Sequence, residues 1–178
     1  GIVHINYGNT ITDNILKLNF YKAFEGGESV FYFLPGLRYF WSISKIFFGD
    51  TLYGYLIVPF VYTGVIFYIF KYIVGIKWAL FITIANFYSN LFEGYALPNI
   101  KMIEHINIGH AEPLAIFFLL LSLLVFLLSL QRTNNFDIKF LGFLLGILLF
   151  FTVLLRPDYL PSSIILLFSY GISPIPGR

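Results

Sequence analysis

Long stretches without a charged residue constrain the fold of this chain more than any other feature. Residues 51–70 are twenty consecutive positions with no charge, and a helix needs about 20 such residues to cross the hydrocarbon core of a bilayer. Of the 178 residues, 58% are hydrophobic and only 11% are charged, whereas roughly 25% are charged in soluble domains. The sequence therefore predicts an integral membrane protein with an all-α fold.

Other apolar stretches separate the remaining charges. We predict membrane spans at residues 51–70, 78–92, 113–130, 140–155 and 159–173. The fourth stretch has only sixteen residues, but Lys139 and Arg156 can extend it, because long cationic side chains reach back toward the membrane surface. The prediction of the second span is weakened by the polar residues near one end of it, and the fifth span is interrupted by Pro161. We expect a polytopic transmembrane helical bundle over residues 51–178, forming one incomplete membrane domain of a longer protein.

The loops between the predicted spans differ in charge. Alternating the spans places residues 1–50, 93–112 and 156–158 on one side, with six basic and eight acidic residues, and leaves a net charge of +4 on the other side. Positive charge marks the cytoplasmic side of a membrane protein. We therefore expect residues 1–50 and 93–112 to face the periplasm or its equivalent. The small net charge of the whole chain, +2, predicts no nucleic-acid partner.

Residues 1–50 predict an external segment with two amphipathic helices. Thr10 can cap the first helix, with Asp13 three residues later as a shortened capping box. The Gly26-Gly27 pair then separates the two helices, because glycine pairs favour turns.

The second external helix is predicted to begin at Pro35 and to stop at Gly49. Its apolar side chains recur at the spacing of one helical face. Arg38, Ser42 and Lys45 share a narrow polar strip beside that face. We expect this helix to lie at the membrane interface, with its aromatic residues at the acyl boundary and its cations turned toward headgroups or a phosphate.

Ionisable residues gather on the predicted external side, where they can form a site. Asp13 can act as a general base if it is partly buried beside a substrate hydroxyl, or it can serve only as a helix cap. The loop NIKMIEHINIGHAEP carries Lys101, Glu104, His105, His110 and Glu112. The two histidines are five positions apart, so they do not share a helical face, and the loop gives little support for a metal site. Glu112 also fits the start of a span, because an acidic first turn complements the helix dipole.

The stretch LLRPDYLP ends the fourth predicted span with Arg156 and places Asp158 two residues later. Ionisable groups at membrane depth often line a substrate path. A local ion pair at the membrane surface is the alternative, and the sequence leaves both open. The chain has no cysteine and none of the patterns GxGxxG, GxxxxGK[ST], HExxH or GxSxG. Nucleotide binding, zinc proteolysis and α/β-hydrolase chemistry therefore lack support.

The order of TDNILKLNFYKAF, PGLRYF, FFGDT, HAEPLAIFFLLLSLLVF and LLRPDYL resembles the membrane-embedded glycosyltransferases of the GT-C superfamily. It is most similar to the bacterial relatives of the protein O-mannosyltransferases and of the lipid A aminoarabinose transferases. The resemblance covers nearly the whole chain through short motifs. It implies a glycosyltransferase of the bacterial inner membrane that moves a sugar from a polyprenyl-phosphate donor to a lipid, glycan or protein acceptor on the external face.

The resemblance also assigns roles to residues. It implies that Asp13 is the catalytic base and that Arg38 and Arg156, with Lys45, hold the donor phosphate. Tyr39, Trp41 and Tyr21 can stack on sugar rings. We expect the other ionisable residues of the external side to contribute to substrate binding, namely Glu104, His105, His110, Glu112 and Asp158. No cofactor is predicted, and no residue pattern supports a divalent metal.

Two other functions fit the same chain. A transporter or flippase of lipid-linked sugars would bind without chemistry, and we would expect polar groups along the middle of several of its spans. The centres of residues 113–130 and 140–155 are almost entirely bulky and apolar, which favours the enzyme. A non-catalytic membrane scaffold is the third function.

Overall fold

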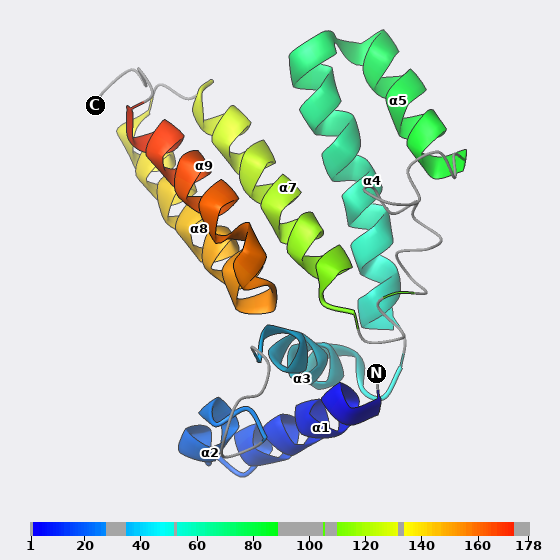
Figure 1. Cartoon of the computed structure of the whole chain (residues 1–178), viewed down its shortest axis with the longest axis vertical. Helices are drawn as coiled ribbons and strands as arrows, with labels where there is room; N and C mark the ends of the chain where they lie inside the picture. Colours follow the sequence, from blue (N-terminus) through cyan, green and yellow to red (C-terminus); the bar gives the residue numbers. More distant parts are fainter. Residues whose placement is uncertain are drawn as a thin grey trace.

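A computed structural model describes residues 2–27, 35–51, 53–88, 105, 110–131 and 134–172, and all regular structure in these residues is helical (Figure 1). The helices are α1 (Ile2–Leu16), α2 (Phe20–Phe24), α3 (Gly36–Phe48), α4 (Tyr53–Val74), α5 (Ile76–Tyr88), α7 (Glu112–Ser129), α8 (Asn135–Leu155), the short 3₁₀ helix η1 (Pro157–Tyr159) and α9 (Leu160–Ile172). The predicted all-α class is confirmed for this part of the chain.

The helices form a bundle and a layer (Figure 1). Helices α4, α5, α7, α8 and α9 run side by side, with α7 packed between α4 and α8. Helices α1, α2 and α3 lie across one end of this bundle. The starts of α4, α7 and α9 and the end of α8 all lie at the end that carries the layer, as the alternation of the predicted spans requires.

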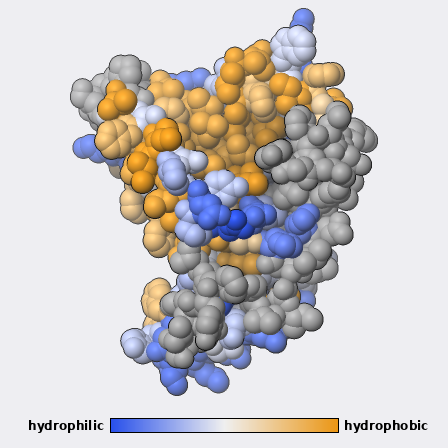
Figure 2. All heavy atoms as spheres, viewed as in Figure 1, coloured by the Kyte–Doolittle hydropathy of each residue, from blue (hydrophilic) through white to orange (hydrophobic). Residues whose placement is uncertain are grey.

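Three helices are long and apolar enough to cross a membrane: Leu56–Val74 in α4, Glu112–Ser129 in α7 and Phe136–Leu155 in α8. Helices α5 and α9 have 13 residues each, which is about 20 Å at 1.5 Å per residue and less than the roughly 30 Å hydrocarbon core. The last residues of the predicted spans at 78–92 and 159–173 lie outside the described residues. Figure 2 shows hydrophobic residues over most of the visible face of the bundle and hydrophilic residues where the bundle meets the layer.

The core of the bundle continues into the layer. One buried cluster joins side chains of α4 and α7 to Leu37 and Trp41 of α3 and to Leu155 at the end of α8. A second cluster joins α7 and α8 to Tyr170 of α9. Helix α3 is therefore held by the hydrophobic core and is not a loosely attached surface helix.

Two glycines allow helices to approach α3 closely. A Cβ atom on Gly36 would lie 2.6 Å from the carbonyl oxygen of Leu154, so the first turn of α3 packs directly on the backbone of α8. A Cβ atom on Gly8 of α1 would lie 2.8 Å from the Cβ of Trp41. No side chain fits at either contact. The contact at Gly36 holds α3 against the bundle, and the contact at Gly8 holds α1 against α3.

The segment of residues 1–50 differs from its prediction in two respects. Thr10 does not cap the first helix, because α1 begins at Ile2 and the Thr10 hydroxyl donates to the backbone oxygen of Asn6 one turn earlier. A threonine in mid-helix commonly bonds back in this way. The layer also contains a third helix, α2, that was not predicted. The end of α3 at Gly49 is confirmed, since this residue has a φ of 66° that favours glycine.

We predict opposite effects from the same substitution at two glycines. Gly36→Ala should destabilise the protein by about 1–3 kcal/mol, because the new methyl group forces α3 off the backbone of α8. Gly64→Ala should be neutral or stabilise by up to about 1 kcal/mol, because it lies within α4 and nothing surrounds its added Cβ within 4 Å. Thermal unfolding of both variants in one detergent measures the difference, and equal midpoints would contradict the close contact.

Candidate functional site

Three ionisable residues meet at the end of the bundle that carries the layer. Arg156 Nη1 donates to Glu112 Oε1 at 2.5 Å, and Arg156 Nη2 donates to Asp158 Oδ2 at 2.5 Å. Glu112 is the first residue of α7, Arg156 directly follows α8, and Asp158 lies in η1. The predicted start of a span at Glu112 and the predicted local ion pair of Arg156 with Asp158 are therefore both confirmed. We call these three residues the ionic cluster.

The ionic cluster favours a charged arginine. The hydrogen bond that Arg156 donates to Asp158, with smaller contributions from Glu112, raises the pKa of Arg156 above its already high usual value. Tyr159 stands beside the cluster, and burial, followed by the nearby charge of Glu112, raises the pKa of its hydroxyl. The cluster carries one positive and two negative charges, and its side chains remain partly exposed.

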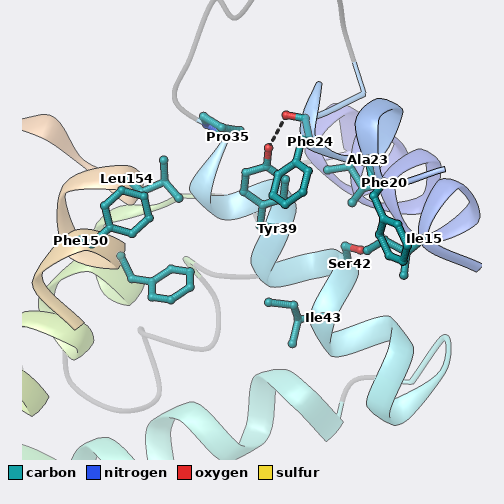
Figure 3. Close-up of a pocket in the computed structure, with 12 residues that line it drawn as sticks. Ile15, Phe20, Ala23, Phe24, Pro35, Tyr39, Ser42, Ile43, Phe150 and Leu154 are labelled. Atoms are coloured by element: carbon teal, nitrogen blue, oxygen red, sulfur yellow. Dashed lines mark hydrogen bonds between the residues drawn. The ribbon is translucent and has the colours of Figure 1, made fainter. Parts of the chain in front are cut away.

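A half-enclosed cavity of about 520 Å³ lies between the layer and α8 (Figure 3). Its lining comes from α1, α2, α3 and α8 and consists of Ile11, Ile15, Phe20, Ala23, Phe24, Pro35, Tyr39, Ser42, Ile43, Phe150, Phe151 and Leu154. Figure 3 shows Phe150 and Leu154 on one side, the α2 residues on the other and Tyr39 between them. The lining is almost entirely apolar.

The few polar groups of this cavity are already hydrogen-bonded within the protein. The Tyr39 hydroxyl donates to the backbone oxygen of Phe24 at 2.7 Å. The Ser42 hydroxyl accepts a hydrogen bond of 3.0 Å from Thr12. Leu154 lines the cavity, and Arg156 follows it by two residues. The apolar cavity and the ionic cluster therefore both involve residues at the C-terminal end of α8.

Arg38 does not lie where the sequence predicted. Its side chain is only 1% exposed. One guanidinium nitrogen donates to the backbone oxygen of Gly26 at 3.1 Å, and the group lies over the ring of Tyr7 at 4.4 Å. The predicted headgroup contact is wrong for this residue, because the polar strip of α3 packs against α1 and the end of α2. Arg38 does not line the cavity.

Other predicted residues also serve the packing of the layer. Lys45 binds the side chain of Asn9 at 2.9 Å and that of Asp50 at 3.0 Å. Trp41 is only 7% exposed and packs in the core, so it has no free face for a sugar ring. Tyr21, in contrast, is 78% exposed on α2.

Asp13 lies exposed on α1, and in the described part of the chain no ion pair or side-chain hydrogen bond engages its carboxylate. The structure therefore does not join Asp13 to the ionic cluster. His105 and His110 pack edge to face, with ring centroids 5.2 Å apart. Glu104 lies outside the described residues. Among those described, no three His, Cys, Asp or Glu side chains are grouped closely enough to hold a metal.

The sequence did not predict the cavity, and it did not predict that Tyr159 lies beside the ionic cluster. Four separate helices contribute most of the lining, and most of the lining residues look like ordinary apolar positions in their own segments. No periodic pattern in the sequence predicts that these four helices enclose a cavity. The aromatic residues of FYKAF do not follow a helical stripe, and they were the one signal in the sequence that could have pointed to the cavity.

Comparison of the chain with protein-family models, with curated proteins and with solved structures found no match in any of the three. The function is therefore argued from the site itself.

We predict that two cations on α3 differ strongly in their effect on stability. Arg38→Met should lower the free energy of unfolding by about 2–4 kcal/mol, because it removes a buried charged hydrogen bond and the contact with the Tyr7 ring. Lys45→Met should cost less than about 1 kcal/mol, because its ion-pair partner Asp50 is 82% exposed. Chemical or thermal unfolding in one detergent measures both. Equal losses would show that Arg38 has no special structural role.

Proposed function

We propose that this chain belongs to a membrane glycosyltransferase that moves a sugar from a polyprenyl-phosphate donor to an acceptor at the layered end of the bundle. The observation that carries the proposal is that Leu154, which lines the apolar cavity, and Arg156, which belongs to the ionic cluster, both lie at the C-terminal end of α8. A polyprenyl phosphate has the same order of parts, with a hydrocarbon chain that ends in an anionic group.

The cavity suits a hydrocarbon chain. Burying each CH₂ group contributes about 0.8 kcal/mol. The hydroxyls of Tyr39 and Ser42 already have partners, so a sugar or a peptide would find few hydrogen-bonding groups there and would leave its own polar groups unpaired. In this proposal the cavity therefore receives the lipid part of the donor and leaves the sugar outside.

Arg156 holds the phosphate in this proposal. A guanidinium has five N–H donors, and the carboxylates of Glu112 and Asp158 engage its two terminal nitrogens. A phosphate reaches the arginine by displacing one of these carboxylates. Phosphate leaves the sugar with the bonding electron pair, and a positioned arginine stabilises the charge that develops on it.

Asp13 remains the proposed base. In the transfer step the acceptor hydroxyl oxygen bonds to the anomeric carbon of the sugar, the bond from that carbon to the phosphate oxygen breaks, and the hydroxyl proton passes to the Asp13 carboxylate. In the described residues no ion pair engages its carboxylate, which leaves it open to an acceptor hydroxyl. Because Asp13 is exposed, the bound acceptor has to supply the partial burial that this role needs. The acceptor must then bring its hydroxyl between α1 and the end of α8.

The transporter alternative receives no support from the centres of the spans. Ser122 of α7 and Thr152 of α8 are buried, and their hydroxyls bond to the backbone oxygens of Phe118 and Leu148 in their own helices. Hydroxyls used in this way do not line a polar path through the bundle.

Sugar transfer from a radiolabelled polyprenyl-phosphate donor, measured in membranes that carry the full-length protein, tests the proposal. Asp13→Asn should lower the transfer rate by about 100-fold or more, because it removes a general base. Arg156→Gln should lower the rate by about 100- to 1,000-fold, because it removes stabilisation of the leaving phosphate.

Two variants at the opposite end of the bundle serve as controls. Asp137→Asn and Lys71→Gln make matching changes of charge in the first turn of α8 and the last turn of α4, and each should change the rate by no more than about twofold. Full activity of Asp13→Asn would overturn the assignment of the base. Absence of transfer with every donor tested would overturn the enzyme and favour the transporter.

A further inference from the structure

Helix α2 forms one wall of the cavity and is the least securely held element of the layer. It has only five residues, and so short a helix is unstable without outside contacts. Leu18 precedes it with a φ of 57°, and Gly26 follows it with a φ of 67°. Leu18 is the one non-glycine residue with a positive φ in the described part of the chain, so an unusual turn sets α2 off from α1.

Few apolar contacts hold α2 in place. Ala23 is its one buried residue, whereas Phe24 is 75% exposed and Phe20 and Tyr21 are exposed as well. The attachment to α3 depends instead on side chains that reach its carbonyl groups. Tyr39 donates to the backbone oxygen of Phe24 inside the helix, and Arg38 donates to that of Gly26 just beyond it.

Of these two contacts, only that of Tyr39 lies at the cavity. Figure 3 shows the hydrogen bond beside the Phe24 ring, with Phe150 and Leu154 of α8 across the cavity. The ring of Tyr39 lines the same cavity. A movement of α2 away from α3 would shift Phe20 and Phe24 and widen the space between them and α8.

We propose that Tyr39 is a positioning residue whose hydroxyl fixes α2 and thereby sets the width of the cavity that receives the hydrocarbon chain of the donor. This inference rests on the proposed function, which identifies the hydrocarbon chain as that of a polyprenyl-phosphate donor. It replaces the stacking of Tyr39 on a sugar ring, which the sequence predicted. The specificity that follows is for the lipid part of the donor and not for its sugar.

The hydroxyl remains a hydrogen-bond donor under ordinary conditions. Burial raises the pKa of Tyr39, and the neighbouring charge of Arg38 offsets only part of this effect. The phenol therefore stays protonated throughout the neutral pH range, and the contact with Phe24 does not respond to pH there.

Tyr39→Phe tests the proposal because it keeps the ring and removes only the hydroxyl. A hydrogen bond of this kind corresponds to about a 2- to 10-fold change in an equilibrium. We therefore expect KM for a long-chain polyprenyl-phosphate sugar to rise by about 2- to 10-fold, with little change for a donor that has a chain of two isoprene units. Tyr53→Phe is the matched control, because Tyr53 is exposed at the start of α4 and does not line the cavity.

A spectroscopic measurement tests the position of α2 without catalysis. The chain has no cysteine, so nitroxide labels can be placed selectively at Tyr21→Cys on α2 and Phe143→Cys on α8, both exposed positions. Electron–electron distance measurements on the reconstituted protein should give a broader distribution in Tyr39→Phe than in Tyr53→Phe. Added polyprenyl phosphate should narrow that distribution.

The KM comparison and the distance measurement distinguish failure of the positioning role of Tyr39 from failure of the proposed enzyme. An unchanged distance distribution in Tyr39→Phe, or an equal rise of KM for long and short donors, would overturn the positioning role even if transfer is active. A broader distribution in Tyr39→Phe, in a protein that transfers no sugar, would support the control of α2 by Tyr39 while the enzyme proposal fails.

Discussion

The burial of the Arg38 charge is the constraint on which the layer of α1, α2 and α3 depends. A guanidinium that is 1% exposed would be strongly destabilising without partners, because it has left water. In the described part of the chain its partners include the Tyr7 ring of α1 and the Gly26 carbonyl after α2. Helix α3 therefore keeps both elements in place, and the cavity wall that α2 supplies follows from this arrangement.

The junction between layer and bundle brings the two halves of the candidate site together. Gly36 sets the start of α3 on the backbone of α8 near Leu154. Two residues further along, Arg156 joins the end of α8 to the start of α7 through Glu112. An apolar cavity and a charged cluster thus lie at one helix end, where lipid and headgroup chemistry would meet. The packing that stabilises the fold also builds the proposed site.

The sequence predicts the long helices well and the layer poorly. Glu112 marks the start of α7, and Arg156 marks the end of α8. Both can be predicted because the edge of a charge-free run is a local property of the sequence. The polar strip of α3 was also read correctly as one face. The element that covers that face is not a local property of the sequence. Arg38 contacts Tyr7 of α1 and Gly26 beyond α2, and Lys45 contacts Asn9 of α1 besides the nearby Asp50. The Thr10 cap failed for a related reason, since the same residue pattern occurs inside a helix.

The contact of Gly36 with Leu154 has a consequence for the order of assembly. A chain is made from its N-terminus, and α1, α2 and α3 can pack on one another through contacts within the first 50 residues. Their seat on the bundle includes the end of α8, which is synthesised much later. Until then the apolar sides of Tyr39 and Ile43 lack the α8 residues that face them across the cavity. During biogenesis this apolar surface is exposed before its partner helix exists, and such a surface is prone to aggregation.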